Sequence, residues 1–348
     1  MITGQRVAQF NKMPKVDLHL HLDGSVKPAT ALELAPEAGI KLPSCELAEI
    51  ERRMRAPERC DNLADYLSAF QFVGQLLHTA GALERVAYEV VEQAAGQNCK
   101  YIEVRFAPQL HTARGLSAEE AIARVLTGLA RGERAFGVKA RCIAICMRHH
   151  PDALNLETVE AAAAFAGKGV VAVDLAGDEA GYPAHLFGNV FALARRRGLP
   201  VTIHAGEATG PDNIRAAVEQ LGAVRIGHGV RLREDPALVR ELRDRNIPLE
   251  MCPISNIQTK ASPGWDVYPI REYYNNGLKV TVNTDNLTVS ATNLAKEYET
   301  LAAHCGFTVP DVCRIIMYGV EAAFLPEPEK RKLARSIEAE FAALNLQF

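Results

Sequence analysis

Residues 200–229 read PVTIHAGEATGPDNIRAAVEQLGAVRIGHG. A short β-rich apolar run over Pro200–His204 predicts one strand, and a similar run over Val224–Gly227 predicts another. Between them, Ile214–Leu221 predicts a helix. A strand, a helix and a strand in this order form a βαβ unit, in which the two strands pair in parallel. The stretch therefore predicts a parallel sheet whose strands are joined by helices.

The same alternation extends along the chain and predicts eight strands in all. The other six are Val16–His21, Tyr101–Arg105, Lys139–Ile145, Val170–Leu175, Pro248–Met251 and Lys279–Asn283. The other helices between strands are Ala118–Ala130, Leu156–Phe165, Leu186–Arg197, Pro236–Arg245 and Pro269–Asn276. Eight such units predict an α/β fold of the closed (β/α)8 barrel type. An open doubly wound sheet is the alternative, but no Gly-x-Gly-x-x-Gly follows the first strand to support it.

The spacing has one exception, between the first and second strands, over about residues 25–98. This stretch contains three predicted helical segments, at Pro28–Ala35, Leu63–Leu77 and Leu83–Ala95. An insertion after the first strand of a barrel lies on the face that carries the active site. We expect part of it to form a helical lid, with extra packing as the alternative. Without a linker or low-complexity tract, residues 1–348 predict a single domain, closed by helices over Thr308–Leu344.

The composition limits the partners that the chain can have. Acidic and basic residues nearly balance, at a formal net charge of −3, so nothing indicates a nucleic-acid partner. No run approaches the ~18 apolar residues that a membrane span needs, and Met1–Lys15 lacks the apolar core of a signal peptide. The eight cysteines form no Cys-x-x-Cys pair, which argues against a zinc ribbon or a disulfide framework. We expect a cytoplasmic protein with a small-molecule partner, and the sequence leaves its oligomeric state open.

Polar side chains stand at the carboxyl ends of several predicted strands, where barrels of this type place their active sites. They are His19 and His21 on the first strand, His204 and Glu207 on the fifth, His228 on the sixth, and Asp285 and Asn286 on the eighth. His19 and His21 face the same side, because they are two residues apart on a strand. Neutral imidazoles and a carboxylate are standard zinc ligands. The pattern predicts a metal site with a histidine and a glutamate left over for acid–base chemistry.

Six motifs occur in a fixed order along the chain. They are VDLHLHLDGS at 16–25, DLAGDE at 174–179, HAGE at 204–207, GHG at 227–229, CP at 252–253 and NTD at 283–285. As a set, and over about residues 13–335, they resemble the motifs of the adenosine deaminase family, within the amidohydrolase superfamily. The resemblance implies an enzyme that uses zinc to hydrolyse adenosine or deoxyadenosine to inosine or deoxyinosine and ammonia.

The resemblance also implies a role for each matching residue. The ligands of one zinc ion would be His19, His21, His204 and Asp285. The catalytic residues would be Glu207, His228 and Asp285, with Glu207 protonating N1 of the purine and His228 beside the attacking water. The substrate-binding residues would be His21, Asp23, Gly177 and Asn286. Of these, Gly177 would offer its N–H to purine N3, and Asp23 would contact the ribose 5′-hydroxyl.

Asn286 is a departure from the family pattern, because many relatives have a second aspartate at this position. An asparagine carries an N–H donor at any pH, so Asn286 can pair with purine N7 directly. The alternative is that Asn286 only caps the helix that follows. The metal-binding pattern is unaffected by the change.

Several other functions remain as alternatives. Adenine or aminodeoxyfutalosine could be the substrate, whereas Asp23 would repel the phosphate of a nucleotide. A protein of another functional class, a catalytically dead purine-binding module, is a further alternative. Such a module would lack a zinc ligand or Glu207, whereas this sequence keeps all of them. A cyclic amide hydrolase would not need a group placed to protonate a ring nitrogen.

Some polar residues have a structural interpretation instead. Glu103 and Arg105, two apart on the second strand, predict an ion pair inside the barrel. Ser255 and Asn256 predict either a helix cap or a pair of residues that support the metal ligands. The fourth strand ends DLAG, without a lysine that could bridge two metals, so a single metal is favoured.

Overall fold

Eight parallel strands form the centre of the molecule in the computed structural model, which describes residues 4–42, 44, 46–57 and 60–346. They are β1 Lys15–His21, β2 Cys99–Phe106, β3 Lys139–Met147, β4 Val170–Ala176, β5 Thr202–Ala205, β6 Arg225–His228, β7 Leu249–Met251 and β8 Val280–Val282. Each predicted strand is present, with its ends shifted by at most three residues. The ladders run in chain order, β1 to β4 and β5 to β8.

Backbone contacts join these two halves and close the barrel. Between β4 and β5, the amide of Val173 donates to the carbonyl of Pro200 at 3.0 Å. Between β8 and β1, Asp285 donates to the carbonyl of His19 at 2.8 Å, and its own carbonyl accepts from His21 at 2.7 Å. The sheet therefore has no open edge, and the prediction of a (β/α)8 barrel is confirmed.

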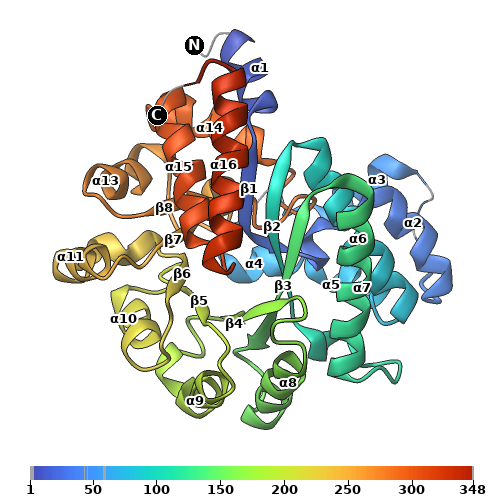
Figure 1. Ribbon diagram of the computed structural model, residues 1–348. Coiled ribbons are helices and arrows are strands. Elements are labelled where there is room, and N and C mark those ends of the chain that lie inside the picture. Colours follow the sequence, from blue (N-terminus) through green and yellow to red (C-terminus); the bar gives the residue numbers. More distant parts are fainter. Residues whose placement is uncertain (1–3, 43, 45, 58–59, 347–348) are drawn as a thin grey trace.

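Helices surround the barrel in Figure 1. Those that follow the strands are α7 Ala118–Phe136, α8 Asp152–Ala164, α9 Gly188–Arg196, α10 Pro211–Glu219, α11 Pro236–Asp244, α12 Pro253–Gln258, α13 Ile270–Asn275 and α14 Leu294–His304. Local signals set their ends. Ser117 and Glu120 form a capping box at the start of α7, and Gly137 ends it at φ 74°. The sequence analysis missed α12 and α14.

The insertion between β1 and β2 divides into two parts. Its helices are α2 Pro28–Glu37, α3 Leu47–Met54, α4 Leu63–Leu67, α5 Phe70–Leu76 and α6 Ala80–Gly96. Only α6 packs along α7 and β2 as an outer barrel helix. The single helix predicted over Leu63–Leu77 is interrupted at Ser68 and Ala69, which gives the short helices α4 and α5. The sequence analysis did not predict α3.

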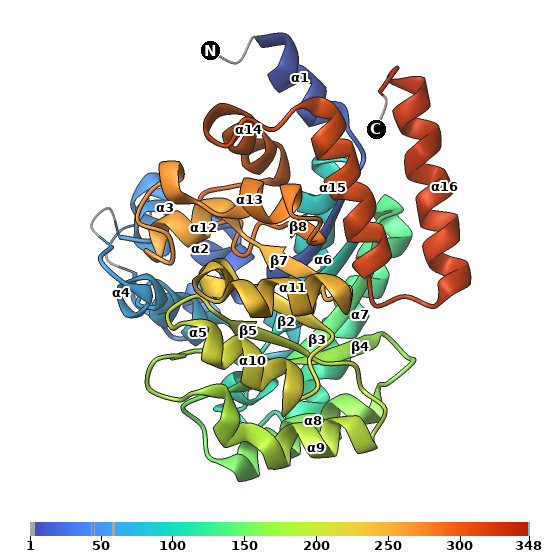
Figure 2. The ribbon, with the colours of Figure 1, turned by 90° about the vertical axis from the view of Figure 1, so that its left-hand side faces the viewer.

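The C-terminal helices cover the opposite end of the barrel from the insertion (Figure 2). They are α15 Val309–Ala322 and α16 Glu327–Ala343, and α1 Gly4–Lys12 lies beside them. α15 packs against β8 and β1, where the barrel closes. The segment after α15 seals the amino ends of the strands, because Phe324 donates its N–H to the buried Glu103 carboxylate at 2.6 Å.

The seven described cysteines are free thiols, and Cys45 lies outside the described residues. Among the helices that the structure describes, none is long and apolar enough to cross a bilayer.

Candidate active site

The predicted strand-end residues come together at the carboxyl end of the barrel. Nε2 of His21 lies 3.4 Å from Nε2 of His19, 3.2 Å from Nε2 of His204 and 3.3 Å from Oδ1 of Asp285. Nε2 of His19 lies 3.6 Å from the same oxygen. Side chains from β1, β5 and the end of β8 therefore direct three nitrogens and one oxygen at a common point.

The hydrogen bonds of two of these histidines show that this arrangement fits a cation. Nδ1 of His19 pairs with Oε2 of Glu250 at 2.9 Å, and Nδ1 of His204 pairs with Oδ2 of Asp174 at 2.9 Å. A carboxylate can only accept, so each Nδ1 carries the proton and each Nε2 presents a lone pair. Lone pairs that converge at about 3 Å repel unless a positive charge lies between them. Burial lowers the pKa of His19 and His21 well below the usual range, which keeps the rings in the neutral form that binds metals.

A network of buried charges forms the floor beneath these ligands. Arg105 donates to Asp174 at 2.7 Å and to Glu250 at 2.7 Å, so one guanidinium holds both carboxylates that orient histidines. Glu250 also accepts from Arg225 at 2.6 Å, and Arg225 pairs with Glu103 at 2.6 Å. The prediction that Glu103 and Arg105 pair with each other is therefore wrong, because each side chain reaches across the barrel to partners on other strands. The sequence analysis missed Glu250, although a charge within an apolar strand was a signal for it.

Asp285 is held in a backbone conformation that is uncommon for a side-chain-bearing residue. Its φ is 60°, in the left-handed region, and His228 has a φ of 64°. Such conformations cost about 1–3 kcal/mol and cluster at functional sites. The hydroxyl of Ser255 donates to Oδ2 of Asp285 at 2.6 Å, which leaves Oδ1 facing the histidines. Ser255 therefore supports a predicted ligand, one of the two interpretations of this residue.

Asn256 fixes the tautomer of His228. Its Oδ1 accepts from the backbone N–H of Cys252 at 3.3 Å and from the hydroxyl of Tyr268 at 2.9 Å. Because the Cys252 N–H can only donate, the amide must point its Nδ2 at Nδ1 of His228, 2.9 Å away. Nδ1 is then an acceptor, and Nε2 of the neutral ring carries the proton. His228 therefore presents an N–H toward Glu207, whose Oε2 lies 3.6 Å from that nitrogen.

Glu207 lies three residues after His204 and is buried, with 7% of its surface exposed. Burial raises the pKa of its carboxyl well above the usual range, and the charges of Asp285 and Glu179 add to the shift. The carboxyl group therefore keeps its proton at a pH where an ordinary glutamate has lost it. That property is the one required of an acid that donates to a ring nitrogen.

A cavity of about 470 Å³ opens above the four converging atoms. Asp23 and Gly177 line it, with Gly177 at φ 105°, and burial raises the pKa of Asp23 to about 6. Helices α4 and α5 of the insertion contribute four further lining residues, Leu63, Tyr66, Leu67 and Phe70. The described residues around this cavity include no lysine or arginine.

Asn286 also lines this cavity, and it does not cap a helix. Asn293 occupies the N-cap of α14, the next helix along the chain. The amide of Asn286 instead donates to the hydroxyl of Tyr66 at 2.8 Å, while its Oδ1 has no protein partner. A Cβ on Gly24 would overlap that amide, so the position of Asn286 requires a glycine at 24. The helix-cap alternative is therefore wrong.

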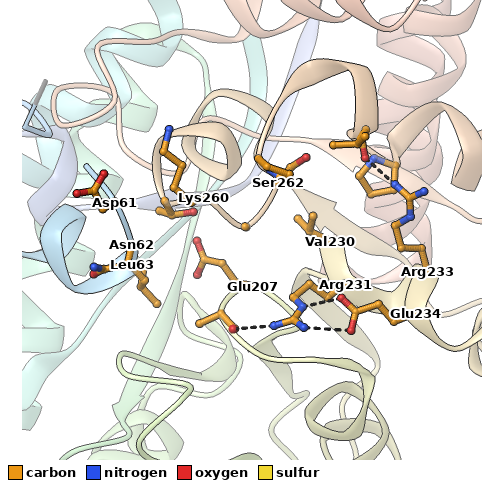
Figure 3. Close-up of a pocket in the computed structure, with 16 residues that line it drawn as sticks. Asp61, Asn62, Leu63, Glu207, Val230, Arg231, Arg233, Glu234, Lys260 and Ser262 are labelled. Carbon is orange, nitrogen blue, oxygen red and sulfur yellow. Dashed lines mark hydrogen bonds and ion pairs between the residues drawn. The ribbon is translucent and has the colours of Figure 1, made fainter. Parts of the chain in front are cut away.

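A second cavity, of about 550 Å³, also borders Glu207 (Figure 3). Glu207 and Leu63 line both cavities. Arg231 lines the second cavity. Its side chain pairs with Glu234 at 2.7 Å and donates to the carbonyl of Ala208 at 3.0 Å. Glu207 therefore borders two cavities, the substrate-sized one and a second one that is lined by charged side chains.

Comparisons with known proteins identify the family. The adenosine deaminase family model matches residues 14–340. An adenosine deaminase of Clostridium perfringens is 42% identical over 325 residues, which are 93% of this chain and 98% of that protein. Among solved structures, an amidohydrolase from Burkholderia ambifaria with bound zinc superposes with a TM-score of 0.91 at 28% identity, over 99% of this chain and 95% of that one. An adenine deaminase from Arthrobacter aurescens superposes at 0.87, with 27% identity over 94% and 98% of the two chains. The chain belongs to the adenosine deaminase family, and its barrel is that of the amidohydrolases.

Proposed function

We propose that this protein is a zinc-dependent adenosine deaminase, which hydrolyses adenosine and deoxyadenosine to inosine and deoxyinosine and releases ammonia. The observation that carries the proposal is the meeting of a His/Asp group suited to a metal ion with a buried glutamate, whose pKa is raised by burial, in one cavity. The 42% identity to an adenosine deaminase over nearly the whole chain supports the same substrate.

One zinc ion would be held by His19, His21, His204 and Asp285. Zinc in such a site lowers the pKa of a water molecule from about 15.7 toward about 7 and so supplies a nucleophile at neutral pH. Zinc suits this donor set because its usual ligands are imidazole nitrogens and a carboxylate oxygen. The zinc in the related Burkholderia structure agrees with this choice.

The acid–base roles follow from which groups hold protons. Glu207 donates its proton to purine N1 as the attacked C6 becomes tetrahedral, so that the ring does not carry the negative charge. His228 already carries a proton on Nε2, so it serves as a hydrogen-bond donor rather than as a base. Asp285 is then the group that accepts the proton of the attacking water.

Substrate contacts would place the nucleoside across the cavity. Gly177 offers its N–H to purine N3, Asn286 donates to N7, and Asp23 accepts from the ribose 5′-hydroxyl. A 5′-phosphate would meet the Asp23 carboxylate without any lysine or arginine among the described lining residues to neutralise it. The cavity therefore favours nucleosides over nucleotides.

A substrate panel tests the proposal. Ammonia release would be measured with adenosine, deoxyadenosine, adenine, AMP, methylthioadenosine and aminodeoxyfutalosine. We expect the highest kcat/KM for adenosine and deoxyadenosine, and little activity on AMP. A preference for adenine or aminodeoxyfutalosine would reassign the substrate within the family, and no ammonia from any member would favour a binding module.

A further inference from the structure

The backbone N–H groups of the loop that carries Glu207 are bound by one buried side chain. Residues 206–209 lie between β5 and α10 and belong to neither element. Their four consecutive backbone N–H groups all donate to the carboxylate of Glu179. Gly206 donates to Oε1 at 2.7 Å, and Glu207, Ala208 and Thr209 donate to Oε2 at 3.0, 2.7 and 3.1 Å. Glu179 is 2% exposed, so water cannot replace it readily.

A more exposed contact holds the carbonyl side of the same loop. The backbone N–H of Arg231 donates to the carbonyl of Gly206 at 2.9 Å, and its side chain donates to that of Ala208 at 3.0 Å. Figure 3 shows this side chain paired with Glu234. Because the Arg231 side chain is 37% exposed, water can take over its contact more easily than that of Glu179.

The charge of Glu179 also acts on Glu207. The groups that shift the pKa of Glu207 are, after burial itself, the carboxylates of Asp285 and Glu179, which raise it. Thr259, which lies beside the carboxyl, and the guanidinium of Arg148 lower it. Nε2 of His228 lies 3.6 Å from Oε2 of Glu207, and Asp61, Lys260 and Arg231 line the second cavity beside it. Glu179 is therefore a negative charge in a fixed position that favours the protonated form of Glu207.

We propose that Glu179 is a positioning residue for Glu207, because its carboxylate fixes the Glu207 loop through four backbone N–H groups. The assignment rests on the proposed role of Glu207 as the proton donor to the purine. The geometric part, that the loop depends on Glu179, does not rest on that role. Glu179 belongs to the DLAGDE motif at 174–179, for which the sequence analysis gave a role only to Gly177.

Glu179→Gln is the sharpest test, because it keeps the length of the side chain but removes the charge and one acceptor. A misplacement of about 1 Å can cost roughly 10²-fold in rate. We expect kcat for adenosine to fall by roughly ten- to a hundredfold, with KM and zinc content close to those of the parent. Glu207 acts in its protonated form, and the negative charge of Glu179 raises its pKa. Removing that charge should lower the pKa of Glu207, so kcat/KM should begin to fall at a lower pH than in the parent. Glu179→Asp keeps the charge but shortens the side chain. In this variant kcat/KM should fall at the same high pH as in the parent, but kcat should be lower.

Two further measurements separate the proposal from general damage and from failure of the proposed function. Amide hydrogen exchange of residues 206–209 should be faster in Glu179→Gln and Glu179→Ala, whatever the substrate. Glu219→Gln, at the end of the helix that follows this loop, removes only an exposed ion pair and should leave loop exchange and rate unchanged. Parent-like exchange, kcat and pH limb in Glu179→Gln would overturn the proposal. If loop exchange changes but the parent does not deaminate adenosine, the proposed function fails and the structural role of Glu179 stands.

Discussion

The floor and the mouth of the site are built in different ways. Beneath the converging histidines, Glu250, Asp174 and Arg105 are fully buried charges that hold one another through bonds of 2.7 Å. The mouth of the cavity is lined by two short helices of the insertion, α4 and α5, and Leu67 on α4 is 37% exposed. Burying charges costs solvation energy. A metal site can keep such buried charges because they fix the orientation of its ligands. Short, partly exposed helices open at lower cost.

The difference between these regions indicates a division of labour. The floor sets the tautomers of His19 and His204 and hence the direction of their lone pairs. The mouth decides which compound lies against Glu207 and Asn286. Changes in the floor should therefore alter metal binding, whereas changes in the mouth should alter substrate discrimination and leave the metal in place.

The largest effect is expected for Glu207, which lies between the two regions. Glu207→Gln keeps the size of the side chain but has no proton to give to N1. We expect kcat to fall by at least the roughly 10²–10⁴-fold typical of general acid catalysis, with zinc content unchanged. Steady-state kinetics together with metal analysis check this. A rate within about threefold of the parent would show that another group donates the proton.

A change in the floor should weaken the metal site by a smaller factor. Glu250→Gln removes the carboxylate that orients His19, and such partners typically contribute about 10–100-fold in metal affinity. Competition with a chelator measures the zinc affinity of the refolded, soluble variant. The matched control is Glu103→Gln, which lies in the same charge network but contacts Arg225 and no histidine. If both variants lose zinc equally, the effect is general destabilisation and the floor does not act through His19.

The smallest effect is expected at the mouth. The experiment compares adenosine with 7-deazaadenosine, in the parent and in Asn286→Ala. If Asn286 donates to N7, the parent should discriminate between them more than the variant does, because a buried donor is left facing carbon. Since one N–H of the amide is already paired with Tyr66, we expect the low end of the usual range, about 1 kcal/mol or roughly fivefold in kcat/KM.

The double comparison also removes the effect of altered ring electronics, which is the same for both proteins. Equal discrimination in the parent and in Asn286→Ala would mean that the residue does not contact N7. Its role would then be to hold Tyr66 of α4 in place. Zinc content should be the same in both proteins, because Asn286 belongs to the mouth.

The strands and the converging residues could be predicted from sequence because both follow local patterns. Apolar runs marked all eight strands, and His19 and His21 share a face through the two-residue period of a strand. The partners across the barrel could not be predicted in this way. Arg105 pairs with Asp174 and Glu250, 69 and 145 residues away, and only the closed barrel brings these strands together.

The contacts of the insertion show the same limit. Tyr66 contacts Asn286 across 220 residues, so the sequence analysis could propose a lid but not name its contacts. The Asn256 amide, which sets the tautomer of His228, was recognised only as one member of a pair with two interpretations. Deciding between them required the positions of the Cys252 N–H and the Tyr268 hydroxyl.

Zinc titration of the metal-depleted protein, followed by adenosine deamination, tests the central claim most directly. Deaminase activity should rise in proportion to added zinc and stop rising at about one zinc per chain, because one group of four ligands is proposed to hold it. His21→Ala, which leaves that group incomplete, should bind little zinc and recover little activity. Saturation at two zinc ions per chain, or full activity on adenosine without metal, would contradict the account.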